Sequence, residues 1–216
     1  MKRIISLITS ALFVMIVSAK AEIGIGVSGA FHLIDGSGTE TTRTSNQKNN
    51  GSHDEQVVVP EIFIEAIDDS GLAVGFSYIP TRELGSKSRT DSNSEGDSGT
   101  YTAKAELENV VKFYTDIPTG NELFGGNMYV HLGVQHVTVA TLESLNSGET
   151  YPDKDIYGAT IGLGSKGELP FGNNLYYKGE VSYTNFETYK GDGTAGNKVS
   201  ADLEDYAARL SIGYKF

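Results

Sequence analysis

The clearest pattern along the chain is an alternation of apolar and polar side chains at its C-terminus. A β-strand directs successive side chains to opposite faces, so residues 203–216 predict a strand with one apolar and one polar face. The apolar face carries Tyr206, Ala208, Leu210, Ile212, Tyr214 and Phe216, and the other face carries Asp205, Ala207, Arg209, Ser211, Gly213 and Lys215. The pattern continues to the last residue, as expected for a strand that closes a sheet.

Seven further segments alternate in the same way, so the sequence predicts eight strands and an all-β fold. The expected strands cover about residues 22–34, 57–68, 72–80, 101–116, 127–140, 155–165, 175–186 and 203–216. Polar stretches at residues 35–56, 81–100, 141–154 and 187–202 are expected to be long loops, and shorter turns are expected at 69–71, 117–126 and 166–174. Long and short connections therefore alternate along the chain.

This arrangement resembles the small outer-membrane β-barrels of Gram-negative bacteria, the group that includes the OmpA-type transmembrane domain, opacity-type surface proteins and porin-like proteins. An even strand number, strands of roughly 9–11 residues and alternating long and short connections are typical of that group. The resemblance implies an eight-stranded antiparallel up-and-down transmembrane β-barrel. It also implies that Leu210, Ile212, Tyr214 and Phe216 form a C-terminal signal read by the barrel assembly machinery, and that outer-membrane lipid and lipopolysaccharide are partners.

Residues 1–21 have the pattern of a secretory signal peptide. Lys2 and Arg3 precede a mainly apolar stretch at residues 4–18, and Ala19-Lys20-Ala21 forms a small-residue cleavage site. The apolar stretch is short for a membrane-spanning helix. We therefore expect cleavage after Ala21, export through the periplasm and a mature barrel domain at residues 22–216.

Composition excludes some classes of function. The formal net charge is −11, and it becomes −14 once the three basic residues of the signal peptide are removed. Because phosphate contacts need lysine and arginine, nucleic acid is not an expected partner. The chain has no cysteine, so its fold must be held by its core and its hydrogen-bond ladders.

Alternation alone does not say which face points outward. A soluble, lipocalin-like barrel places its apolar face inside, whereas a membrane barrel does the reverse. The polar faces carry glycines, small residues and mid-strand charges of both signs, which suit a narrow lumen filled by paired side chains. We therefore predict a membrane barrel with a lumen charge network of Glu61, Glu65, Lys104, Glu106, Glu108, Lys112, Lys178, Glu180 and Arg209.

Arg209 is the central residue of the predicted network. It lies on the polar face of the last strand, seven residues from the chain end, which places it near the middle of the membrane. An unpaired guanidinium would be costly in a narrow lumen, so we expect it to bond to Glu180 or to the pair Glu106 and Glu108. The network is then a structural plug or, alternatively, a gate that passes small solutes when it rearranges.

Three classes of function remain open at this point. The first is a structural or narrow porin-like channel, and the second is an adhesin or phage receptor that acts through the four polar loops. The third is a lipid-modifying enzyme, for which His32 with Asp35 and Ser37 is the candidate group. Serine and aspartate are too common in these loops for that group to predict a triad, so no enzyme is expected.

The four histidines do not predict a metal site. No two of them have the HxH or HExxH spacing that places imidazoles on one ion. The sequence therefore predicts no metal and no cofactor.

Overall fold

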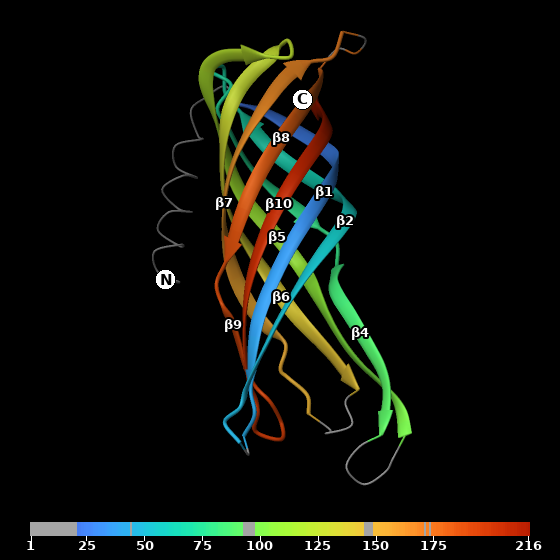
Figure 1. Cartoon of the computed structure of the whole chain (residues 1–216). Helices are drawn as coiled ribbons and strands as arrows, with labels where there is room; N and C mark the ends of the chain where they lie inside the picture. The colour runs from blue at the N-terminus through green and yellow to red at the C-terminus, as the bar shows by residue number, and fades with distance from the viewer. Residues whose placement is uncertain (1–20, 44, 93–97, 145–148, 171, 173) are drawn as a thin grey trace.

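The protein is described by a computed structural model that covers residues 21–43, 45–92, 98–144, 149–170, 172 and 174–216. These residues form a tall barrel (Figure 1). Its strands are β1 (Glu22–Thr41), β2 (Lys48–Ile67), β3 (Ala73–Ile79), β4 (Arg82–Ser92), β5 (Ser98–Leu123), β6 (Gly126–Ser144), β7 (Lys154–Glu168), β8 (Leu175–Phe186), β9 (Tyr189–Asp192) and β10 (Lys198–Lys215). The predicted signal peptide lies outside the described residues, apart from Ala21.

No helix in the described ranges has the length and apolar character needed to span a membrane.

Eight strands close into a ring, so the predicted eight-stranded antiparallel barrel is confirmed. The order around the ring is β1-β2-β3-β5-β6-β7-β8-β10, and β10 pairs back with β1. The remaining two strands extend the wall: β4 pairs with β5 beyond the end of β3, and β9 pairs with β10 beyond the end of β8. Every pairing is antiparallel.

The last strand closes the barrel as its pattern predicted. The β1–β10 ladder runs from Gly24 opposite Lys215 to Thr41 opposite Lys198, and the Phe216 amide donates to the Ile23 carbonyl at 2.9 Å. Closure leaves no open sheet edge at this seam, which a barrel wall in lipid requires.

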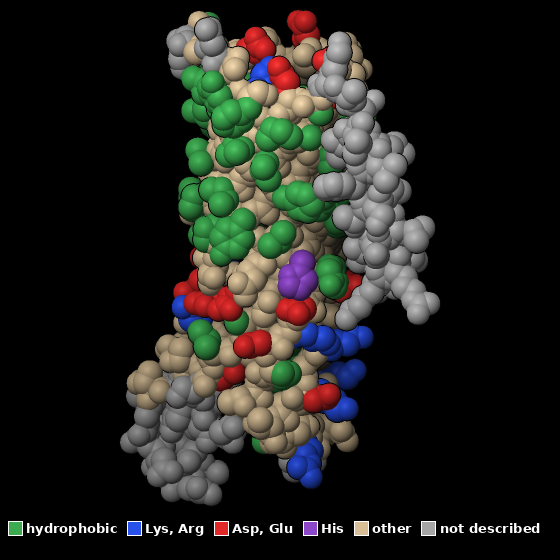
Figure 2. Space-filling view, turned by 180° about the vertical axis from the view of Figure 1, so that it is seen from behind, with side chains coloured by type: hydrophobic (Ala, Val, Ile, Leu, Met, Phe, Trp, Pro, Cys, Tyr) green, Lys and Arg blue, Asp and Glu red, His purple; other side chains and the backbone are tan. Residues whose placement is uncertain are grey.

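The apolar faces of the strands point outward. Exposed apolar side chains include Ile23, Ile25, Val27, Phe31, Ile62, Ile64, Phe76, Leu132, Val134, Ile161, Leu163, Val181, Leu210, Ile212, Tyr214 and Phe216. On the face that Figure 2 shows, hydrophobic side chains (green) cover one part of the wall, and charged side chains gather beyond its edge. Leu210 is 76% exposed although it lies in the middle of a long strand. This distribution confirms the predicted faces and is that of a barrel in lipid.

Both described ends of the chain lie at the end of the barrel that has the tight turns (Figure 1). At one such turn the Asp68 carboxylate accepts hydrogen bonds from the amides of Ser70 at 2.8 Å and Leu72 at 3.0 Å, which confirms the turn predicted at 69–71. Outer-membrane barrels place short turns in the periplasm, so we assign this end to the periplasm and the long hairpins to the cell exterior.

The stretches at 35–56 and 81–100 are largely strand in the described residues, so their prediction as loops was wrong, whereas residues 149–153 and 193–197 of the other two stretches lie outside strands. The β1–β2 ladder continues to Thr41 opposite Lys48, and the β4–β5 ladder continues to Ser92 opposite Ser98. Outside the membrane both faces of a strand meet water, so the alternation that marked strands disappears while the backbone ladder persists. The barrel wall therefore extends well beyond its apolar belt.

The connection predicted at 117–126 is also mostly strand. β5 runs to Leu123, and the reversal takes only Phe124 and Gly125, both with positive φ (53° and 77°). Pro118 lies where the β5–β6 register shifts, and the ladder resumes at Glu122 opposite Asn127.

The outward face of β10 gives a first prediction. Leu210→Arg should destabilise the inserted barrel by about 2–4 kcal/mol if the side chain meets the bilayer midplane, because a charge would then face lipid. Ser200→Arg is the matched control, since residue 200 lies on the same face of β10 but opposite Thr39 in the extracellular extension.

The measurement is unfolding by urea in lipid vesicles. An equal cost for the two arginines would contradict the assigned membrane belt.

Candidate functional site in the lumen

The inner faces of the strands fill the membrane-spanning part of the lumen with paired charges. Lys178 on β8 lies nearest the periplasm and is almost fully buried. Its ammonium is 2.6 Å from Asp116 Oδ2 and 2.8 Å from Glu65 Oε2. Tyr114 and Tyr176 donate to the same Glu65 carboxylate at 2.8 Å and 2.9 Å. One cation and two phenols thus satisfy two buried carboxylates.

Arg209 on β10 forms the middle of the network. It bonds to Glu180, directly opposite it on β8, and its Nη2 donates to Glu61 Oε1 at 2.8 Å. The predicted Arg209–Glu180 pair is therefore confirmed, while the second partner is Glu61 rather than the acidic pair on β5. Tyr129 adds a hydrogen bond to Glu180 at 3.2 Å, so both ends of the ion pair have further polar partners.

A third cluster lies on the extracellular side of Arg209. The Asp205 carboxylate accepts from Arg82 Nη2 at 3.1 Å, and it lies 2.9 Å from His32 Nδ1. The other nitrogen of His32 is 3.9 Å from Glu61, which links this cluster to the middle one. His32 is thus buried in the lumen, whereas Asp35, the next member of the triad candidate, lies on the opposite face of β1.

His131 joins the lower and middle clusters. Its Nδ1 lies 2.7 Å from Asp116 and 3.1 Å from Glu180, and the three residues bring possible metal ligands within 4.8 Å of one another. Lys178 and Arg209 already supply positive charge to the two carboxylates. The group is therefore part of an ionic network that is neutralised by its own side chains.

Six of the nine predicted network residues meet in the lumen, and three do not. Glu61, Glu65, Lys112, Lys178, Glu180 and Arg209 are buried inside. Lys104, Glu106 and Glu108 lie on the other face of β5, where Lys104 pairs with Glu106 at 2.6 Å and with Glu83 at 3.1 Å.

The error has a local cause at Asn109. This residue has a positive φ of 53°, and the β5–β6 register shifts between Glu108 and Val111. A bulge adds one residue, so the inner face changes from odd to even positions: Leu107 is inside before the bulge, and Val110 and Lys112 are inside after it. The prediction had assumed one parity along the whole strand.

An apolar layer fills the lumen on the extracellular side of the charges. It consists of the buried side chains of Ile34, Val59, Ile79, Leu107, Val110, Val137, Val139, Ile156, Phe186, Tyr189 and Leu203. Most of these residues lie on inner-face positions that were predicted to be uniformly polar. Val57, Leu84, Val199 and Ala201 pack against the layer.

Above this layer the lumen opens into an apolar chamber of about 700 Å³. The room arises because small residues occupy inner positions of the strand extensions, among them Gly36, Gly38, Gly51, Ala103 and Ala105. A Cβ added at Gly51 would meet no atom within 4 Å, so this glycine leaves open space. The floor includes Ile34, Val139 and Leu203 from the apolar layer. A volume of this size lies within the about 300–1,000 Å³ usual for small-molecule sites.

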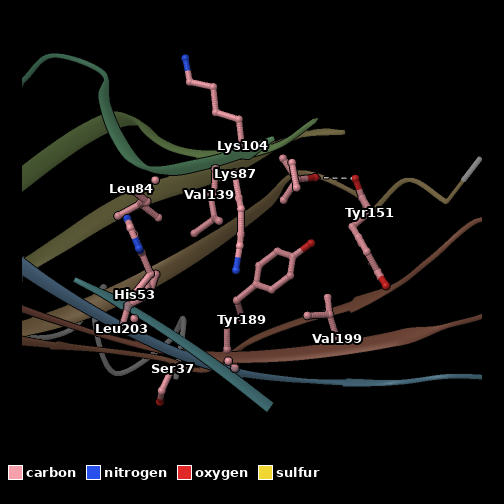
Figure 3. Close-up of a pocket in the computed structure, with 18 of the residues that line it drawn as sticks. Ser37, His53, Leu84, Lys87, Lys104, Val139, Tyr151, Tyr189, Val199 and Leu203 are labelled. Carbon is pink, nitrogen blue, oxygen red and sulfur yellow. Dashed lines mark hydrogen bonds between the residues drawn. The ribbon is translucent and has the colours of Figure 1, made fainter. Parts of the chain in front are cut away.

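The polar groups around the chamber are few, and most of them are already paired. Figure 3 shows Lys87 directed into the space near Leu84, Tyr189 and Val199, whereas Lys104 points away from it. Tyr151 donates to Glu40 at 2.7 Å, and burial raises the pKa of its phenol, so the donor keeps its proton at neutral pH.

Within the described ranges, the wall of the chamber has no ladder at the seam between β2 and β4. The β2–β3 pairing ends at Ile62 opposite Tyr78, and β4 pairs with β5 alone. In place of backbone bonds, the ring of His53 on β2 packs against Gly85 on β4, where even an added Cβ would clash with it. Two residues of the chamber wall thus close this seam.

The prediction from sequence missed the partners that complete the network. His32, Arg82, Asp116, His131 and Asp205 are buried with the predicted charges. Asp205 lies on the same polar face of the last strand as Arg209, so the sequence pattern could have placed Asp205 in the lumen as well. The apolar layer could also have been noticed in the sequence. Odd positions of β2 and β6 form the faces predicted to point into the lumen, and the same odd positions carry Val57, Val59, Val137 and Val139.

Comparison with known proteins supports the fold. No protein-family model and no curated protein matches the chain. The outer membrane protein OprG from Pseudomonas aeruginosa is similar with a TM-score of 0.56 and 15% identity, over 91% of this chain and 97% of that one. Neisserial surface protein A is similar with a TM-score of 0.43 and 12% identity, over 90% and 97%.

The fold is that of the small outer-membrane barrels, and the outward apolar belt agrees with it. The chain has the fold of a bacterial outer-membrane β-barrel. At such low identity the likeness carries the fold alone, so the role of the lumen must be argued from its own residues.

The Arg209–Glu180 contact gives a second prediction. Arg209→Ala or Glu180→Ala should each cost about 3–5 kcal/mol of stability, because each leaves an uncompensated buried charge. The double variant should lose less than the sum. Lys104→Ala removes an ion pair on the outer face of β5 and should leave stability nearly unchanged.

Unfolding by urea in lipid vesicles measures all four variants. Additive costs for Arg209 and Glu180 would show that the two residues do not interact.

Proposed function

We propose that the protein is a narrow, normally closed outer-membrane channel whose extracellular chamber receives small apolar molecules. The observation that carries the proposal is the stacking of two unlike regions in one lumen: an apolar chamber outside and an ionic network beneath it. Apolar solutes gain free energy when their surface leaves water, and the chamber offers an apolar surface for this.

The composition of the chamber supports an apolar occupant. Its floor and sides present aliphatic side chains and Tyr189, and the carboxylate of Glu40 is engaged by Tyr151 and by Asn197 at 3.2 Å. Glycine and alanine occupy positions where larger residues would fill the space. A purely structural barrel has no need for such room, since a narrow lumen is stabilised by being filled.

The region below the chamber supports a closed resting state. Ions would meet the apolar layer, where desolvation is costly, and then side chains that already have partners. On the periplasmic side the network gives way to a polar vestibule of about 490 Å³ lined by Lys166, Glu168 and Lys215. Passage would therefore require the network to rearrange, so Arg209 and Glu180 are proposed as the gate.

Surface interaction is the second candidate, and the tethering of the extracellular connections favours it. The backbone amide of Arg43 donates to Asn197 at 3.0 Å, and the Ala195 amide donates to Glu149 at 2.9 Å. Connections that are hydrogen-bonded to one another present a preorganised surface, which lowers the entropy cost of binding a partner. Such a surface suits an adhesin or a phage receptor. Outer-membrane lipid, lipopolysaccharide and the barrel assembly machinery are proposed partners under either function, and no enzymatic step is proposed.

Filling the chamber tests the proposal directly. Gly51→Phe places a ring in the open space and should weaken binding of 4-butylbenzyl alcohol to protein in lipid nanodiscs. Gly29→Phe is the matched control, because a Cβ added at Gly29 would also meet no atom within 4 Å, yet Gly29 is exposed on the outer face of β1.

Equilibrium dialysis against empty nanodiscs gives the affinity. Wild-type binding no greater than that of empty nanodiscs would end the chamber proposal and leave the surface-interaction candidate.

Ion conductance tests the closed state separately. Wild-type protein in planar bilayers should show no steady current, because the lumen is filled. Arg209→Ala should introduce current, since it removes the side chain that bridges Glu61 and Glu180. Lys104→Ala, on the outer face, should remain silent, and steady current through wild type would overturn the closed state.

A further inference from the structure

Lys87 adds a positive charge to a mainly apolar chamber whose carboxylates, Glu40 and Glu143, accept hydrogen bonds from neutral donors. The β4–β5 register places Lys87 opposite Ala103 and Gly85 opposite Ala105, all on the inner face. Lys104 lies opposite Ser86 on the other face. Figure 3 shows the Lys87 ammonium directed into the chamber and the Lys104 ammonium directed away.

The two lysines also differ in their partners. Lys104 is paired with Glu83 and Glu106. Within the described part of the chain, no carboxylate oxygen lies within 4 Å of the Lys87 ammonium, and the structure gives it no hydrogen bond. Among the described residues, Lys87 is thus a lysine of the chamber lining without an ion-pair partner.

The two carboxylates of the chamber lining, those of Glu40 and Glu143, accept hydrogen bonds from other residues. Glu40 accepts from the Tyr151 hydroxyl and from Asn197. Glu143 accepts from the Tyr151 backbone amide at 3.5 Å, and burial raises the pKa of its carboxyl, which disfavours its charged form. Neither arrangement supplies Lys87 with a counter-ion, so the site has room for an anion from outside.

We propose that the chamber binds amphipathic organic anions: molecules with an apolar body and a single anionic head such as a carboxylate. The inference rests on the proposed function and names the class of ligand that the chamber prefers. The body occupies the space left by Gly51, Ala103 and Ala105, and the head meets the Lys87 ammonium. A hydrogen bond between two charged groups is stronger than one between neutral groups, so Lys87 discriminates between an acid and the corresponding alcohol.

The test compares two probes that share an apolar body, 4-butylbenzoate and 4-butylbenzyl alcohol. Binding to full-length mature protein in zwitterionic nanodiscs is measured by equilibrium dialysis at pH 7.5, and binding to empty nanodiscs is subtracted. Wild type should bind the acid about tenfold more tightly than the alcohol, the size expected for one charge-assisted contact.

Three variants locate the source of this preference. Lys87→Met should lower affinity for the acid about tenfold and leave affinity for the alcohol unchanged. Lys87→Arg should retain the preference because the charge remains. Lys104→Met should also retain it, since that lysine belongs to the same strand pair but faces outward.

The outcomes separate the two proposals. Equal binding of acid and alcohol by wild type, or an acid preference that survives Lys87→Met, would overturn the anion proposal and leave the apolar chamber in place. Failure of both probes to bind wild type would overturn the chamber together with the ligand class. If Lys87→Met still binds the alcohol, the variant is folded. Loss of acid binding by this variant then shows that Lys87 contacts the anionic head group.

Discussion

The structure depends on the narrowness of its lumen. Eight strands enclose a space just wide enough for side chains, so every inner-face residue must find a neighbour inside. Charged residues there must be paired, because their water has been removed. Arg209 meets this demand through Glu61 and Glu180, and Lys178 meets it through Glu65 and Asp116. The ionic network is therefore the consequence of closing an eight-stranded ring around polar strand faces.

Most of the fold could be predicted from the sequence because lipid imposes a strict rule on the wall. Apolar residues must alternate with lumen residues wherever the strand crosses the membrane, and Tyr206 to Phe216 obey that rule throughout. The rule ends at the membrane boundary. Beyond the membrane boundary, strands such as β4 carry mainly polar side chains and show no alternation. They are held by backbone hydrogen bonds, which do not depend on a particular side-chain pattern.

The candidate site was harder to predict because it depends on which face of each strand points inward and on which residues lie opposite one another on neighbouring strands. One left-handed residue, Asn109, moved Lys104, Glu106 and Glu108 from the lumen to the outer face. The Arg209–Glu180 pair could be predicted because the two residues lie on adjacent strands with known parity. The contact of His32 with Asp205 required the register of β1 against β10, which the sequence does not state.

Under the proposed function, the order of regions along the lumen lets one narrow barrel bind a molecule in its chamber without conducting ions. An ion entering from outside would first lose its water in the apolar layer around Leu107 and Val110. An apolar molecule can enter the chamber, but further inward it meets paired charges that have no favourable contact to offer it. For an ion, the apolar layer and the paired charges are barriers in series, so loss of the paired charges lowers the total barrier. For an apolar molecule, the paired charges are the main barrier. Occupancy of the chamber and opening of the lumen are thus separate steps, and only the second requires Arg209 to exchange its partners.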